Sequence, residues 1–135
     1  MTKKYLMTFA NQFFQKIMFD IFRKYLEDKI TLTNQDLELI ESVSVIKKIR
    51  KHQYLLQEGE TMKHYNFVCN GFLKMYSIDA NGQEHIMQFV PENYWTGDRE
   101  SIESDVPAKY NIDAVEDSVV LLIKKNDFFF ISASY

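Results

Sequence analysis

Apolar residues recur at three- and four-residue steps near the start of the chain, whereas most of the remainder alternates between apolar and polar positions. The helical spacing is carried by six residues: Phe9, Phe13, Phe14, Ile17, Ile21 and Tyr25. It predicts an amphipathic helix that packs on the body of the domain, and a partner-binding or membrane-surface helix is the other interpretation of the same stripe. Because Met18 would serve equally well as a natural start, residues 1–17 are interpreted as an extension.

A second, shorter helix is predicted to begin after Thr33. The threonine hydroxyl can cap the first turn, and Asp36 at the third helical position favours the positive end of the helix dipole. The segment "DLELIESV" continues the pattern, and its apolar side is formed by Leu37, Leu39 and Ile40.

From Val43 onward the pattern changes to that of short strands. "VSVIKKIRKHQYLLQEGE" is closed by a turn at Gly59, and Gly71 interrupts "HYNFVCNGFLKMYSI". Asn81-Gly82 is the strongest hairpin signal, and a turn at residues 116–117 separates two further strands before a helix that starts near Asn126. Roughly eight short strands with flanking helices predict a mainly β fold, either a sandwich, a jelly roll or a barrel.

Composition narrows the classes of protein that fit this pattern. The chain has 135 residues, enough for one domain with a single core, and a net charge of -3, which does not favour binding of nucleic acid by this chain alone. Its one cysteine, Cys69, cannot form an internal disulfide. No apolar run approaches the roughly 18 residues of a membrane span. We therefore expect a cytoplasmic protein that does not contact a membrane.

Five segments in order resemble a known family: "LLQEGE", "FVCNGFLKMY", "DANGQEHIMQF", "YWTGD" and "NIDAVEDSVVLLIKKNDF". Together they are similar to the cyclic-nucleotide-binding domain of Crp/Fnr-type bacterial regulators, over residues 22–130. The resemblance implies a double-stranded β-helix, or jelly roll, flanked by helices. It divides the chain into a helical extension at residues 1–32 and the jelly-roll domain at residues 33–135.

The same resemblance implies where the chain stands in a longer regulator. Residue 135 falls near the start of the helix that makes the homodimer in the family, so no DNA-binding domain is expected within this chain. The family resemblance thus predicts a sensor domain, either a part of a longer regulator or a stand-alone domain, that forms a homodimer in the full-length regulator and makes no DNA contact by itself.

The resemblance also places a phosphate-binding cassette, the family's ligand loop, at "GDRESIESDVPAKYN". Gly97 and Asp98 stand where the family has Gly-Glu, whose carboxylate binds the ribose. The family's phosphate-binding arginine is replaced by Ala108, so Lys109 is the predicted cation. Tyr110 stands where the family keeps a small residue, and its ring is predicted to fill the pocket.

Two further residues complete the predicted ligand-binding set. Arg99 follows Asp98 and could pair with Glu103 one helical turn later. Trp95 could stack on a planar ligand, although the core interpretation, in which it plugs an end of the barrel, is favoured. The basic run from Lys47 to His52 is interpreted as the solvated face of a strand.

The leading hypothesis is a non-catalytic sensor domain with a degenerate cassette, in which cyclic AMP is not the expected ligand. Its effector would be another small anion, a different cyclic nucleotide, or none. One alternative is a jelly-roll metalloenzyme of the cupin type, but the three histidines, at positions 52, 64 and 85, form no His-x-His pair. The other alternative is a ligand-free structural dimerisation module. Cys69 is predicted to be a small buried residue.

Overall fold

The computed structural model describes residues 2–133, which form four helices and eight strands. The helices are α1 (Lys3–Glu27), α2 (Asn34–Val43), α3 (Arg99–Ser104) and α4 (Lys125–Ala133). The strands are β1 (Ser44–Ile49), β2 (Tyr54–Leu56), β3 (His64–Asn70), β4 (Leu73–Ile78), β5 (Glu84–Val90), β6 (Trp95–Thr96), β7 (Asn111–Ala114) and β8 (Ser118–Lys124).

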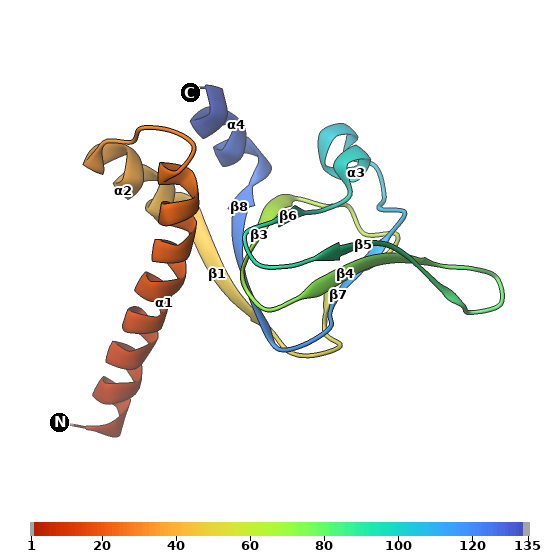
Figure 1. Cartoon of the computed structure of the whole chain (residues 1–135), viewed down its shortest axis with the longest axis horizontal. Coiled ribbons are helices and arrows are strands. Elements are labelled where there is room, and N and C mark those ends of the chain that lie inside the picture. The colour runs from red at the N-terminus through yellow and green to blue at the C-terminus, as the bar shows by residue number, and fades with distance from the viewer. Residues whose placement is uncertain (1, 134–135) are drawn as a thin grey trace.

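The strands form two four-stranded antiparallel sheets. The first has the order β1-β8-β3-β6 and the second the order β2-β7-β4-β5, so the chain passes from one sheet to the other several times. The β4–β5 pair is the long hairpin around Asn81-Gly82, and it projects beyond the sandwich (Figure 1). The expected mainly β, jelly-roll type of fold is confirmed, in the form of two packed sheets rather than a closed barrel.

Two apolar layers hold this arrangement together. One lies between the sheets and includes Leu56, Val68, Leu73, Ile112 and Val120. The other lies on the outer face of the first sheet, where side chains of the helices cover it. The outer layer is formed by Phe19, Phe22, Ile40, Phe67, Cys69, Val119, Leu121 and Ile123. The outer face of the second sheet carries no helix among residues 2–133 (Figure 1).

The prediction that α1 packs on the domain is confirmed for its second half and is wrong for its first half. Phe19 and Phe22 are buried against the sheet, whereas Phe9, Phe13 and Ile17 are exposed. Figure 1 shows the reason, because the first turns of α1 project past the edge of the sheet. Spacing predicted the helix correctly but could not show how far the sheet extends beneath it.

Local sequence explains where the elements begin and end. The Thr33 hydroxyl accepts the Asp36 backbone N–H at 3.1 Å, and the Asp36 carboxylate accepts the Thr33 N–H at 2.8 Å, which is a complete capping box. Gly71 has φ of +101° between β3 and β4, and any Cβ there would overlap Ser118. The Gly71 turn therefore requires glycine for both conformation and space.

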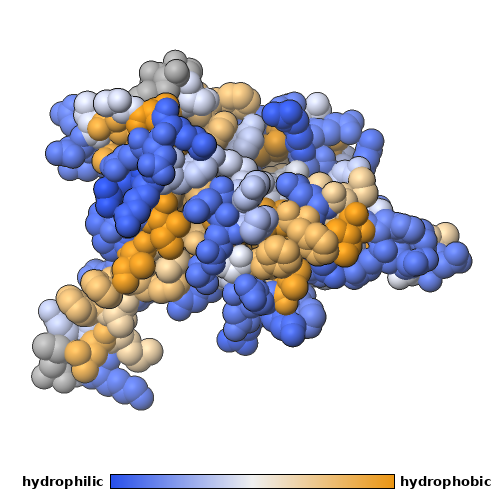
Figure 2. Space-filling view, viewed as in Figure 1, coloured by the Kyte–Doolittle hydropathy of each residue, from blue (hydrophilic) through white to orange (hydrophobic). Residues whose placement is uncertain are grey.

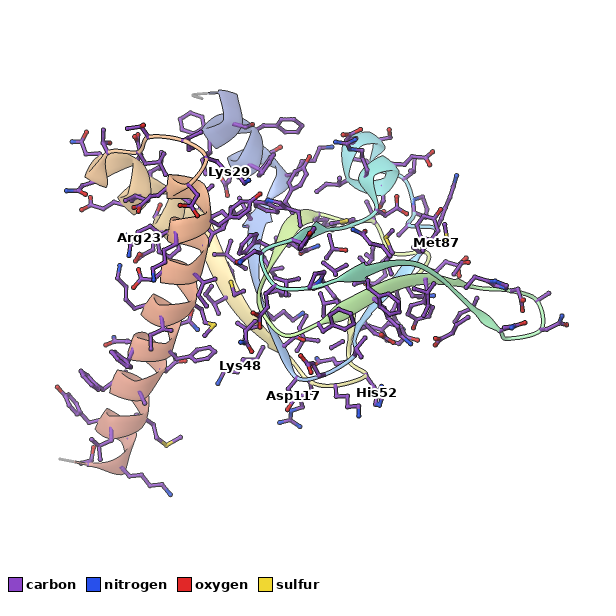
Figure 3. All side chains as sticks on the ribbon, in the orientation of Figure 1. Arg23, Lys29, Lys48, His52, Met87 and Asp117 are labelled. Atoms are coloured by element: carbon purple, nitrogen blue, oxygen red, sulfur yellow. The ribbon has the colours of Figure 1, made fainter. Side chains whose placement is uncertain are left out.

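The ends of the sandwich differ in character. The β1–β2 turn with His52 and the β7–β8 turn with Asp117 lie together at the end away from α3 (Figure 3), where the Asp117 carboxylate accepts the Lys51 N–H at 2.8 Å. Lys47 and Lys48 are exposed in β1, but residues 50–52 lie in the turn after it, so the solvated-strand interpretation holds only for the first part of the basic run. Within residues 2–133, none of the helices is both long and apolar enough to cross a bilayer.

Candidate functional site

The predicted cassette connects β6 in the first sheet to β7 in the second and contains the short helix α3 (Figure 1). Asp98 is the N-cap of this helix, and Asp105 ends it with φ of 54°. The short-helix shape that the family resemblance implied is therefore present. Its chemistry depends on what each side chain of the loop contacts.

Asp98 is only 5% exposed, and both of its carboxylate oxygens accept backbone hydrogen bonds. Oδ1 accepts the Ser101 N–H at 3.1 Å, which caps α3. Oδ2 accepts the Lys109 N–H at 2.8 Å, which ties the end of the loop to its beginning. A ribose hydroxyl at this place would have to compete with both bonds.

Gly97 packs against the end of the Met62 side chain. A Cβ at residue 97 would overlap the terminal methyl group of Met62, whose sulfur accepts the Asp98 N–H at 3.1 Å. The Met62 N–H in turn donates to the buried Ser101 hydroxyl at 2.9 Å. The start of the cassette is thus fastened to the β2–β3 connection.

Ala108, which the resemblance predicted at the place of the family's arginine, is buried among the apolar residues between the sheets, with 3% of its surface exposed. Its N–H donates to the Glu60 carbonyl, and its carbonyl accepts the Gly59 N–H, both at 2.8 Å. The isolated bridge between Thr61 and Pro107 extends this pairing. This buried methyl group offers no charge to an anion.

The two cations of the loop lie on its surface, and each pairs with a neighbouring glutamate. The Lys109 side chain is 69% exposed, and its Nζ lies 3.2 Å from Glu100 Oε2. The Arg99 side chain is 89% exposed, and its Nε lies 3.4 Å from Glu103 Oε1, which confirms the predicted i,i+4 pair. Ion pairs as exposed as these contribute little to stability, typically about 0–1 kcal/mol.

Tyr110 is half-buried at the end of the loop. The following residue, Asn111, is buried and accepts the Glu58 N–H at 2.8 Å. That the Tyr110 ring fills a ligand pocket stays a prediction.

The structure does not bring Trp95 together with the other predicted site residues. Its indole N–H donates to the Tyr25 hydroxyl at 3.2 Å, and its ring packs against Phe22 and Phe67. These partners belong to the layer under the helices, whereas the cassette packs on the layer between the sheets. Trp95 is therefore a partly buried residue that joins α1 to β6 in the layer under the helices, and it does not plug an end of the sandwich.

The end of the cassette helix is linked to the start of α4. The Lys125 ammonium donates to the Glu103 carbonyl at 3.3 Å and lies 3.6 Å from the Asp105 carboxylate. An open hollow of about 610 Å³ adjoins this link, and its lining includes Lys63, His64 and Lys124. The two contacts of Lys125 join the end of α3 to the start of α4.

Histidine and cysteine side chains make no shared site in the described part of the chain. His85 lies 2.8 Å from Asp79 in the β4–β5 hairpin, and this hydrogen bond lowers the pKa of the Asp79 carboxyl. Partial burial, with the charge of Lys124 as a second cause, lowers the pKa of His64. Cys69 is buried as predicted, and burial raises the pKa of its thiol to about 12. Residues 2–133 hold no group of three or more His, Cys, Asp or Glu placed to bind a metal.

Sequence reasoning missed a polar network on the outer face of the second sheet. The buried Tyr76 hydroxyl donates to the Asp113 carboxylate at 2.9 Å, and Lys74 lies 4.0 Å from the same carboxylate. Burial first, then hydrogen bonds with Tyr54 and Asp113, raises the pKa of Tyr76. Alternation in "NIDA" indicated that Asp113 faces away from Ile112, but its partner is 37 residues distant.

The comparisons with known proteins agree with this geometry. The family model described as "Cyclic nucleotide-binding domain" matches residues 46–135. The "Anaerobic regulatory protein" of Bacillus subtilis (strain 168) is 26% identical over 96 residues, which cover 70% of this chain and 40% of that protein. The chain therefore spans less than half the length of this curated relative.

Two solved structures share the fold at low identity. The sensor domain of the transcriptional regulator DNR from Pseudomonas aeruginosa has a TM-score of 0.73 at 17% identity and covers 89% of this chain and 79% of that chain. The Catabolite Activator Protein of Thermus thermophilus has a TM-score of 0.66 at 16% identity, and the match covers 76% of this chain and 48% of that chain.

Proposed function

Because this chain belongs to the cyclic nucleotide-binding domain family, we propose that it is the non-catalytic sensor domain of a Crp/Fnr-type regulator whose cassette does not hold a cyclic phosphate. The observation that carries the second half of this proposal is the buried methyl group of Ala108. A cyclic phosphate brings a full negative charge into a loop that is partly buried from water. Such a charge needs a charge-assisted partner there, and none projects from residue 108.

The remaining groups of the cassette do not replace that partner. Asp98 already accepts two backbone hydrogen bonds, so its carboxylate serves the loop itself. The Lys109 ammonium is exposed and paired with Glu100, so binding a phosphate there would mean giving up that pair while remaining in water. Water screens such a contact and leaves it weak.

Two observations support a regulatory role. The relatives named above include an anaerobic regulatory protein and the sensor domain of a transcriptional regulator. In this chain, the contacts of Lys125 with Glu103 and Asp105 join the cassette helix to α4. A signal that shifts α3 would therefore reach α4, after which the family resemblance places a dimer helix. The proposed signal is carried by a small anionic effector other than a cyclic nucleotide, or by a partner that binds the cassette.

Thermal unfolding in the presence of nucleotides tests the proposal. At a ligand concentration of about 100 times the dissociation constant, a ligand of the folded state contributes about 2.7 kcal/mol of stability, which raises the melting temperature by several degrees. We expect no such rise with cyclic AMP or cyclic GMP at about 1 mM. A clear rise with either nucleotide would overturn the claim about the cassette.

The Lys109→Ala variant and a panel of small organic anions complete this test. If an anion raises the melting temperature of the wild type but not of the variant, Lys109 is the cation of a functional anion-binding site. Glu100→Gln is the matched control, because it releases Lys109 from its ion pair and should then strengthen binding of that same anion.

A further inference from the structure

The first half of α1 carries an apolar stripe that the rest of the chain does not cover. Five residues form it, and each has at least 42% of its surface exposed: Tyr5, Leu6, Phe9, Phe13 and Ile17. Phe9 and Phe13 are 61% and 62% exposed. Figure 2 shows hydrophobic residues along this projecting arm of the molecule. We call these five residues the α1 stripe.

The α1 stripe points away from the sheet that the second half of the helix covers. At 3.6 residues per turn, Lys4, Thr8, Asn11 and Gln15 lie on the same side of the helix as Phe22, which is buried against β3. Apart from Met7 and Phe14, the latter packed on the outer layer, the side directed toward the body is therefore polar in the first half, and the five stripe residues lie on the far side. Bending the helix back onto the sheet could not bury them.

We propose that the α1 stripe binds the same stripe of a second copy of this chain, with the two helices antiparallel. A symmetric pair places Phe9 of each copy beside Phe13 of the other, and Leu6 beside Ile17. The two bodies then lie on opposite sides of the helix pair, because each stripe points away from its own sheet. Two identical surfaces related by a twofold axis are the commonest interface among soluble oligomers.

The exposed area is consistent with a weak dimer. With aromatic side chains of about 150–250 Å² each, the stripe offers roughly 500 Å² per copy, or roughly 1,000 Å² for two copies. Specific interfaces begin at about 1,200 Å², so a contact of this size is a weak and transient one. We therefore expect a dissociation constant on the order of micromolar or weaker.

Charge selects the antiparallel arrangement. Lys3, Lys4 and Lys16 are the charged side chains of the segment from residue 2 to residue 19, and the first acid is Asp20. Parallel helices would place these lysines beside their own copies. The antiparallel pair sets each lysine apart from its own copy and brings Lys3 level with Asp20, which already pairs with Arg23 of its own chain at 3.2 Å.

Sedimentation of the whole chain over about 10–500 µM tests the proposal. We expect a concentration-dependent monomer–dimer equilibrium in the wild type. Phe13→Glu should weaken it at least about tenfold while the melting temperature stays unchanged, because residue 13 contacts solvent in the monomer. Phe129→Glu is the matched control: it changes an exposed phenylalanine of α4 and should leave the equilibrium unaffected.

Disulfide trapping tests the direction of the helices. Leu6→Cys and Ile17→Cys chains are oxidised separately and as a mixture; the buried Cys69 stays out of the reaction. The antiparallel pair cross-links one variant to the other in the mixture and gives little disulfide when the Leu6→Cys chain is oxidised alone. Parallel helices instead cross-link the Leu6→Cys chain to itself and give little disulfide between the two variants in the mixture.

Three results would overturn the proposal. The first is a monomer at every concentration, and the second is a dimer that Phe129→Glu dissociates and Phe13→Glu does not. The third is a monomer that floats with vesicles of anionic lipid and loses this behaviour on Phe13→Glu, since a membrane surface would then be what covers the stripe.

Discussion

At the scale of single residues, Asp98 is a structural carboxylate inside a loop that resembles a ligand site. Asp98→Ala removes the acceptor of two backbone N–H groups in a buried setting, so we expect a loss of about 2–4 kcal/mol in the free energy of unfolding. Asp98→Asn keeps one acceptor and should lose less. Urea unfolding of the two variants measures this, and an unchanged midpoint for Asp98→Ala would refute the structural role.

Tyr76 gives a second residue-scale prediction, in which stability depends on pH. Tyr76→Phe leaves the Asp113 carboxylate without its 2.9 Å donor, and we expect a loss of about 1–3 kcal/mol at neutral pH. The pKa of Tyr76 is raised in the folded state, so its contribution is complete below the ordinary tyrosine pKa and declines as pH rises above about 10. Denaturant unfolding of both proteins should therefore show their difference narrowing at alkaline pH. A difference that stays constant up to about pH 11.5 would contradict the assignment.

At the scale of elements, the two halves of α1 both carry aromatic residues but lie in different environments. Phe22→Ala empties space beside Phe67 and Trp95, so we expect it to cost about 3–5 kcal/mol. Phe13→Ala, at an exposed position of the same helix, should change stability by less than about 0.5 kcal/mol. Urea unfolding, at a protein concentration low enough for any dimer to dissociate, compares the stabilities of the two variants. Equal losses would mean that the exposed half packs on the body after all.

The elements also show how much of this molecule could be predicted from its sequence. Turns depend on local chemistry, so Gly59, Gly71 and Asn81-Gly82 marked strand ends correctly, and Thr33 marked the start of α2. Contacts between distant segments could not be predicted from spacing alone. Trp95 bonds to Tyr25, 70 residues away, and the Asp98 carboxylate meets the Lys109 N–H only because the loop folds back. Five of the six predicted site residues lie between β6 and β7 and Trp95 lies in β6, but only the packing shows what each of their side chains contacts.

At the scale of the whole molecule, α1 joins a covered half to an exposed one, and deleting each part separately has different consequences. A chain that begins at Met18 keeps Phe19, Phe22 and Tyr25 over the first sheet. It loses mainly exposed side chains, so we expect its melting temperature to stay within a few degrees of the full chain. It should also lose the self-association proposed for the α1 stripe.

A chain that begins at Asp28 removes the three aromatic residues and exposes Phe67 and Leu121 of the sheet beneath them. Burial of each large apolar side chain contributes about 1.5–3 kcal/mol, and domains of this size have only about 5–15 kcal/mol of net stability. We therefore expect this chain to be unfolded or aggregated, as measured by circular dichroism and by sedimentation. If it instead melted cooperatively at the temperature of the full chain, residues 1–32 would be a separable extension, as the predicted domain boundary has it. If only the chain that begins at Met18 melts cooperatively near the temperature of the full chain, the domain boundary lies inside α1, and the second half of the helix belongs to the jelly-roll domain.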